Sequence, residues 1–183
     1  MEVLVSVVAL WSESDHLLSV LSPIGLALSR NPSLVVDLDP SGPSYRCPFT
    51  LADLVREGPT KDQLDPAKGG VSVLPNGGVA VQDAAEVVGA LVQRWPNVVI
   101  RCDPHSQPPR TAISILPLLP DPFLGQRSER IVYQSLGLQV RAPEGAFVLP
   151  PPGSATLNAL TGLSAVPKRS KWMRALGKLW SYA

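Results

Sequence analysis

Four short segments of the sequence are apolar at almost every position, with no alternation between apolar and polar residues. They are Val3–Leu10, Leu34–Leu38, Val71–Leu74 and Val98–Cys102. A strand of this composition is buried on both faces, as in a parallel sheet with helices on each side. Helical patterns separate these segments along the chain, and strands that alternate with helices favour parallel pairing. The sequence therefore predicts a three-layer α/β fold, in which a mostly parallel sheet has helices on both faces.

The rest of the chain supplies the helices and further strands of this prediction. Helical patterns or capping signals cover residues 15–29, 50–56, 82–94, 123–136 and 154–163, and extended patterns cover 111–116, 138–141 and 146–149. Thr50, with Asp53 three residues later, has the spacing of a helix N-cap. Pro23 is expected to kink the first helix or delay its start, because proline lacks a backbone donor. Gly137 is expected to end the helix over 123–136.

Composition limits the class of protein. The chain has 183 residues, of which 45% are apolar and 17% charged, so it is long enough and apolar enough for one folded domain. Cys47 and Cys102 match no metal-binding spacing, so we expect neither a metal site nor a structural disulfide. Met1–Leu10 lacks a basic start and is interpreted as a strand, not as a signal peptide. Because no apolar run reaches about 20 residues, we expect a cytoplasmic protein.

One turn and its neighbours carry a family resemblance. Residues 34–42 read LVVDLDPSG, residues 71–77 read VSVLPNG, and the strand over 98–102 follows Trp95-Pro96. In this order the segments resemble the ParA/MinD family of deviant P-loop (SIMIBI-type) ATPases, nearest to the TadZ/CpaE or MinD branch. The resemblance covers roughly residues 1–120. It implies a P-loop NTPase-like, Rossmann-like sheet in which the DxDP turn follows the second strand.

The departures from that family concern its nucleotide site. A phosphate-binding loop needs glycines, whose amides can approach the phosphates, and a lysine that pairs with their charge. Residues 9–18 read ALWSESDHLL, with no glycine, no lysine and two acids that would repel a triphosphate. In the strand over 98–102, Arg101 stands at the position where the ParA/MinD family has the aspartate that acts on the metal ion. We therefore expect a pseudo-ATPase with lost Walker motifs, no catalytic residues and no cofactor.

A degenerate nucleotide site would still have identifiable members. These are Trp11, Ser12, Ser14, Asp37, Asp39 and Asp103. A simpler interpretation of the two aspartates of the DLDP turn is that they are turn-forming, partly solvated acids. His16 and His105 lie near predicted strand ends but lack clustered partners, which favours a surface role.

The C-terminal tail is basic and amphipathic. Residues 1–167 carry 11 basic and 15 acidic residues, whereas residues 168–183 carry five basic residues and no acid. We predict an α/β domain over 1–166 and a basic amphipathic helix over 167–183. Its contact residues would be Lys168, Arg169, Lys171, Trp172, Met173, Arg174, Leu176, Lys178, Leu179 and Trp180. Such a helix can lie in an anionic membrane interface, pack back onto the domain, or contact nucleic acid.

Two functional hypotheses of different classes follow. The first is a positioning or assembly scaffold that binds partner proteins, forms a homodimer and attaches to the inner membrane face. The family resemblance suggests a pilus, secretion or division machine as the partner. The second is an unorthodox nucleotide-dependent switch that uses Asp37 and Asp103. A partition-type protein associated with nucleic acid is a further alternative.

Overall fold

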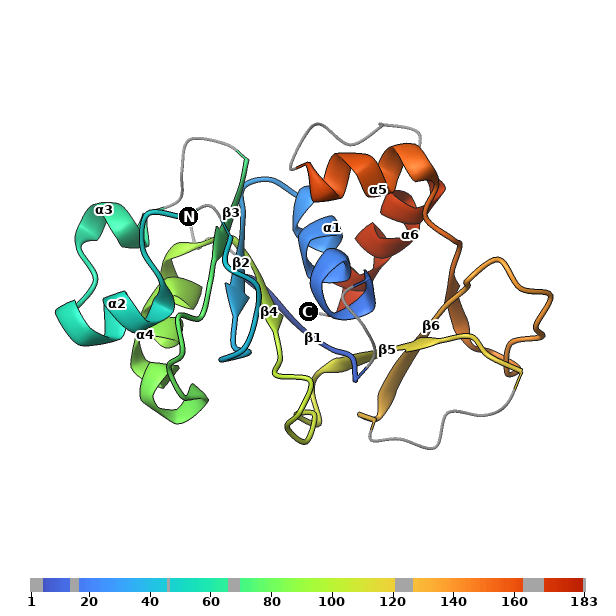
Figure 1. Cartoon of the computed structure of the whole chain (residues 1–183), viewed down its shortest axis with the longest axis horizontal. Helices are drawn as coiled ribbons and strands as arrows, with labels where there is room; N and C mark the ends of the chain where they lie inside the picture. The colour runs from blue at the N-terminus through green and yellow to red at the C-terminus, as the bar shows by residue number, and fades with distance from the viewer. Residues whose placement is uncertain are drawn as a thin grey trace.

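The protein forms one seven-stranded sheet in which every strand pair is parallel (Figure 1). The computed structural model describes residues 5–13, 17–45, 47–65, 70–120, 127–162 and 170–182. The strands are β1 (Ser6–Trp11), β2 (Ser33–Asp37), β3 (Val71–Leu74), β4 (Asn97–Arg101), β5 (Ile113–Pro117), β6 (Arg130–Gln134) and β7 (Phe147–Leu149). Their spatial order is β3-β2-β4-β1-β5-β6-β7. The predicted α/β class with a parallel sheet is confirmed.

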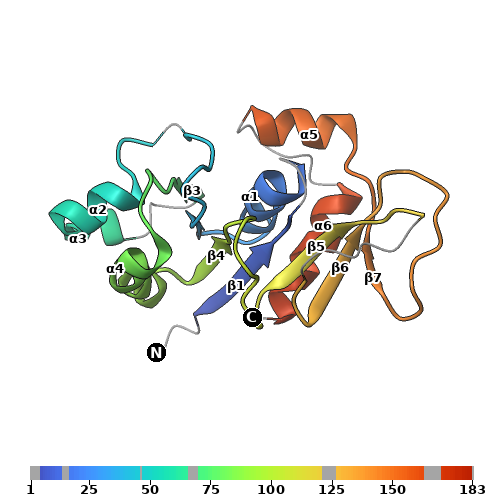
Figure 2. The same ribbon diagram turned by 60° about the horizontal axis from the view of Figure 1, so that its bottom comes forward.

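Helices cover the sheet on both faces (Figures 1 and 2). The helical elements are η1 (Leu17–Leu21), α1 (Ser22–Leu28), α2 (Leu51–Glu57), α3 (Lys61–Leu64), α4 (Val81–Arg94), α5 (Ser154–Thr161), α6 (Lys171–Gly177) and η2 (Lys178–Tyr182). One hydrophobic core joins α1, α5, α6 and η2 to the sheet, and a second joins α2 and α4 to the opposite face of β2 and β4. This is the three-layer arrangement expected from fully buried strands. In the described part of the chain, no helix is long and apolar enough to cross a membrane.

Strand order creates a crevice between β2 and β4. From β2 the chain continues outward to β3, at one edge of the sheet, whereas from β4 it crosses to β5 on the other side of β1. The two connections therefore diverge at the carboxyl ends of neighbouring strands. In open parallel sheets, this is where ligands bind.

Local sequence signals account for two of the helix starts. Thr50 and Asp53 form a reciprocal capping box at the start of α2, as their spacing predicted. The first helical segment begins as a single π-helical turn, η1, and becomes α-helical at Ser22, with Pro23 in the first turn of α1. Because the first amides of a helix need no intrahelical acceptor, proline is tolerated there.

The prediction of a helix over 123–136 is wrong. Residues 130–134 form strand β6, which pairs with β5 and β7; residues 121–126 lie outside the described part. Ile131, Val132 and Tyr133 are β-branched or aromatic, and such side chains fit a pleated surface better than a helix. Gly137, expected to end that helix, has φ of +83° in the turn that follows the strand. The extended segment expected over 138–141 is irregular, and that over 146–149 is β7.

Candidate functional site at the carboxyl edge of the sheet

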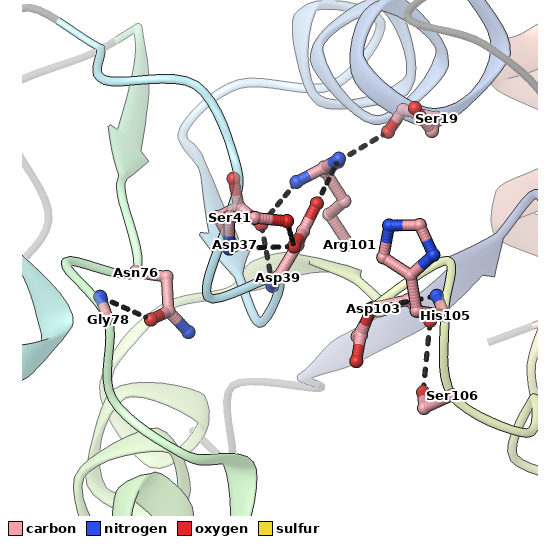
Figure 3. A network of polar contacts seen from close by, with 10 residues as sticks. All are labelled: Ser19, Asp37, Asp39, Ser41, Asn76, Gly78, Arg101, Asp103, His105 and Ser106. Carbon is pink, nitrogen blue, oxygen red and sulfur yellow. Dashed lines mark hydrogen bonds and ion pairs between the residues drawn. The ribbon is translucent and has the colours of Figure 1, made fainter.

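Arg101, the last residue of β4, occupies the crevice between β2 and β4 (Figure 3). Its side chain is only 4% exposed and makes three charge-assisted hydrogen bonds. Nη1 donates to Oδ1 of Asp37 at 2.6 Å, and Nη2 donates to Oδ2 of Asp39 at 2.8 Å. Nε donates to the main-chain oxygen of Ser19 in η1, also at 2.8 Å. One guanidinium thus links β4, the end of β2 and the first helical turn after β1.

Strand register and turn chemistry bring these groups together. Asp37 and Arg101 are direct Cα partners in the parallel β2–β4 pair. Beyond the strand, the amide of Asp39 donates to Oδ1 of Asp37 at 2.9 Å, which folds the chain back toward the sheet. The amide and the hydroxyl of Ser41 both donate to Oδ1 of Asp39, leaving Oδ2 for the arginine. The DLDP turn is therefore shaped by its own aspartates.

Gly42 allows this turn to close over the ion pairs. A Cβ at this position would lie 2.5 Å from Oδ2 of Asp37 and 2.7 Å from Nη1 of Arg101. It would also lie 3.0 Å from the main-chain oxygen of Asp39. Real Cβ atoms do not approach other atoms so closely, so any side chain here would push the turn away from the guanidinium.

Burial and pairing act differently on the two aspartates. Burial raises the pKa of Asp37 above its ordinary value, and attraction to Arg101 opposes this shift. Burial also acts to raise the pKa of Asp39, but hydrogen bonds from Ser41 and the guanidinium bring it below its ordinary value. Oδ2 of Asp37 is buried without a hydrogen-bond partner among the described residues, which satisfy this carboxylate only in part.

Trp11 fills the neighbouring position at the end of β1. Its side chain is 1% exposed, and its Nε1 donates to the main-chain oxygens of Asp103 and Ser106, each at 3.1 Å. The ring packs with Cys102, Ala112 and other buried residues of the sheet. In a nucleotide-binding protein of the predicted family, the phosphate-binding loop would begin at this strand end. Here a large apolar ring is fixed there and holds the loop after β4.

The structure describes two of the three remaining predicted nucleotide-site residues, Ser12 and Asp103. Ser12 is buried beside Trp11, whereas Ser14 and His16 lie outside the described residues. Asp103 accepts the amide of His105 at 2.8 Å and points away from the arginine cluster (Figure 3). Where the structure describes the chain, no group of three or more potential metal-ligating His, Cys, Asp or Glu side chains occurs.

The C-terminal helix packs on the domain. Trp172, Leu176, Leu179 and Trp180 are all buried in the main core. Nε1 of Trp172 donates to Oε1 of Gln134 at 2.7 Å, and Nε1 of Trp180 donates to the main-chain oxygen of Leu26 at 3.2 Å. Packing onto the domain, one of the alternatives left open by the sequence, is thus the arrangement observed.

The polar side of the helix faces solvent. Lys171, Arg174 and Lys178 are exposed and Met173 is half-buried, while Lys168 and Arg169 lie outside the described residues. The domain therefore covers the larger apolar side chains proposed for lipid contact and leaves the described cations exposed. The covered residues are Trp172, Leu176, Leu179 and Trp180, and the exposed cations are Lys171, Arg174 and Lys178.

Sequence reasoning placed Arg101 at the aspartate position of the family but did not include it in the site. The sequence does contain a signal that points to Arg101 as a member of the site. An arginine at the end of the apolar run Val98–Ile100, in a strand buried on both faces, needs a buried counter-charge. Asp37 and Asp39, at the end of the neighbouring predicted strand, are suitable partners.

Comparison with known proteins adds no family assignment. The chain matches no protein-family model and none of the curated proteins. The fold itself is a parallel α/β sheet of the P-loop or Rossmann-like type.

Proposed function

We propose that this protein is a non-hydrolysing, ParA/MinD-like scaffold, in which the nucleotide crevice is closed by the protein's own side chains. The observation that carries the proposal is the guanidinium of Arg101, held between Asp37 and Asp39 at 2.6 and 2.8 Å. In an active relative, an aspartate after the second strand would act through a magnesium ion. Here an internal cation satisfies the carboxylates instead.

The residues present do not fit a magnesium–triphosphate group. A metal ion at the two aspartates would have to displace a buried guanidinium that makes three hydrogen bonds. A displaced guanidinium would lose its partners in a buried place, which is costly. At the end of β1, the Trp11 ring stands where a glycine-rich loop would be needed. Positioning or assembly of partner proteins is the function that such a closed fold can still serve.

Thermal unfolding with ATP and magnesium tests this proposal. A nucleotide present at 100 times its Kd would stabilise the fold by about 2.7 kcal/mol, which raises the Tm of a domain of this size by about 5–10 °C. We expect no shift for the native chain with ATP, magnesium or both. A saturable, magnesium-dependent rise in Tm would overturn the proposal and favour the switch that uses Asp37 and Asp103.

A matched variant tests whether the guanidinium is what excludes the cation. Arg101→Ser removes the internal charge and leaves both carboxylates facing the crevice. We expect magnesium or calcium alone to raise the Tm of this variant and not that of the native chain, because the metal replaces the lost counter-charge. An equal response of the two chains would show that Arg101 does not close the site.

We propose that the exposed cations of α6 and η2 provide the attachment to an anionic surface. Insertion of the apolar side would require Trp172 and Leu176 to leave the core, whereas Lys171, Arg174 and Lys178 face solvent as folded. Each cation near an anionic leaflet contributes about 1 kcal/mol, so three together change binding roughly a hundredfold. Because Trp172 and Trp180 are buried, neither is free to stack on nucleic-acid bases, which makes the partition-type alternative weaker.

Co-sedimentation with vesicles that contain phosphatidylserine tests this attachment. We expect the variant K171E/R174E/K178E to lose most binding at low salt. The matched control is R110E/R127E/R141E, which changes the net charge equally at three exposed arginines elsewhere. Equal loss in both variants would mean that net charge, and not this helix, determines binding. Truncation of the helix is a poor test, because it would expose the core.

A further inference from the structure

The helices on the two faces of the sheet differ in charge. The segments 17–36 and 145–183, which include η1, α1, α5, α6 and η2, contain six Lys or Arg residues and no Asp or Glu. These helices share a core on one face of the sheet, and α2, α3 and α4 lie on the other (Figure 1). Together α2, α3 and α4 contain five acidic and three basic residues. An anionic surface would therefore attract the first face and repel the second.

Arg30, two residues after α1, adds a cation to the exposed side of α6 and η2. Nε1 of Trp180 donates to Oγ of Ser29 at 3.0 Å, which places the end of α1 against η2. The guanidinium of Arg30 lies over the Trp180 ring, 5.6 Å from its centroid. Its Nη1 donates to Oγ of Ser6 at 3.1 Å. A guanidinium has five N–H donors, and this hydrogen bond uses one of them. The exposed side chain of Arg30 is thus held beside η2.

Arg130, the first residue of β6, adds a second cation from the sheet. It precedes Gln134 by four residues, so its side chain lies on the strand face where Gln134 accepts the indole of Trp172. Nη1 of Arg130 donates to the main-chain oxygen of Tyr182 at 2.8 Å, and its guanidinium lies 5.9 Å from the centroid of the Tyr182 ring. Tyr182 is 43% exposed. The end of η2 therefore carries a fixed cation and an amphipathic ring, a combination that suits a bilayer interface.

These two arginines join Lys171, Arg174 and Lys178 in a cationic surface of five residues along α6 and η2. None of the five forms an ion pair with an acid among the described residues. Arg30 and Arg130 are far from α6 in the sequence, and only the fold brings them beside η2. An arginine can bind a phosphate group through two parallel N–H donors, whereas a lysine acts as a point charge.

We propose that this cationic surface, with Arg30 and Arg130 as members, docks on the phosphate groups of an anionic lipid bilayer and turns α2, α3 and α4 away from the lipid. The inference rests on the attachment proposed above and extends it to two residues outside the C-terminal helix. The bilayer is the partner that the charges favour, since the helices of this face carry no acid that anionic lipid would repel. Helices about 10 Å in diameter on opposite faces of a sheet are farther apart than the Debye length of about 10 Å at 0.1 M salt. The acids of the far layer therefore act only weakly on the lipid.

Co-sedimentation of the full chain with phosphatidylserine vesicles at about 0.1 M salt tests the two arginines. The variant R30Q/R130Q removes two charges. Because each cation near an anionic leaflet changes binding about fivefold, we expect roughly a 25-fold loss. The variant R30K/R130K keeps both charges and should retain most of the binding. The matched control R56Q/R94Q removes two charges from α2 and α4, and it should change binding by less than about twofold.

Two added charges test the orientation without removing any cation. Ser181→Lys adds a cation to η2, and Gln93→Lys adds one to α4; both positions are exposed. The two variants have the same net charge. We expect Ser181→Lys to bind the vesicles about fivefold more tightly than the native chain, and Gln93→Lys to differ from it by less than about twofold.

The outcomes separate this inference from the attachment on which it rests. If the native chain does not bind the vesicles, or if K171E/R174E/K178E binds them equally well, both fail. Binding that depends on α6 but is unchanged in R30Q/R130Q, or that rises equally in Ser181→Lys and Gln93→Lys, would overturn this inference alone. A loss in R30K/R130K as large as that in R30Q/R130Q would overturn it as well, because the role of the arginines would then be structural. A DNA duplex that competes with the vesicles and shows the same dependence on the variants would assign the surface to nucleic acid instead.

Discussion

The crevice at the carboxyl ends of β2 and β4 and the surroundings of Trp95, the residue that follows α4, differ in how their buried polar groups are satisfied. In the crevice, Arg101 pairs with both aspartates and with the main chain of Ser19. The indole N–H of Trp95 is also buried but has no hydrogen-bond partner among the described residues. The place where this fold ordinarily binds a ligand is thus filled by the protein itself, with the charges paired internally.

The largest expected effect comes from removing the charge that fills the crevice. Arg101→Met keeps much of the side-chain length but leaves Asp37 and Asp39 with no counter-charge in a buried place. We expect the free energy of unfolding to fall by about 3–5 kcal/mol, as measured by urea denaturation. The triple variant D37N/D39N/R101M removes the uncompensated charges as well and should recover much of the loss. A loss below about 1 kcal/mol for Arg101→Met would contradict the described ion pairs.

A smaller effect is expected from a single methyl group in the turn. Gly42→Ala places a Cβ within 2.7 Å of both Asp37 and Arg101. Since neither charged group can move without losing its partner, we expect a loss of about 1–3 kcal/mol. Gly89→Ala is the matched control, because Gly89 is exposed in α4 and no atom of the described residues lies within 4 Å of the added Cβ. That variant should be slightly stabilised, by about 0.5–1 kcal/mol in urea unfolding; equal losses for both would contradict a tightly closed turn.

Much of the fold could be predicted from the sequence, but the content of the crevice could not. The runs that became β2, β3 and β4 are apolar enough to define buried parallel strands, and Thr50 and Asp53 define a helix start without tertiary information. β6 was missed because its five residues follow a stretch with helical spacing, and its pairing with β5 supplies the deciding contacts. The ion pairs depend on the β2–β4 register, which no local pattern encodes.

Replacing the same atoms in two tryptophans measures the hydrogen-bond difference directly. Trp172→Phe removes the donor to Oε1 of Gln134, a side chain with no exposed surface. Trp95→Phe removes a donor that has no acceptor among the described residues. Both substitutions shrink the ring equally, so we expect Trp172→Phe to cost about 1–2 kcal/mol more in urea unfolding. Equal costs would indicate that Trp95 has a partner, such as a tightly held water.

The pH dependence of stability provides the smallest effect and separates the two aspartates. The pKa of Asp39 is lowered below 3.8 in the folded chain, so its contribution is present above pH 3.8 and is lost as the pH falls through the lower folded value. The pKa of Asp37 is raised above 3.8, so the folded state keeps this proton to a higher pH than the unfolded state does. Stability therefore declines as the pH rises from 3.8 to that higher value.

Urea unfolding between about pH 2 and pH 6 measures both effects. Asp39→Asn should flatten the plot of stability against pH below pH 3.8, and Asp37→Asn should flatten it above pH 3.8. The slopes are the measurement, because both variants also lose part of the ion pair and start from lower stability. If both variants changed the same side of the profile, the two carboxylates would share one environment, and the asymmetry of the arginine cluster would be refuted.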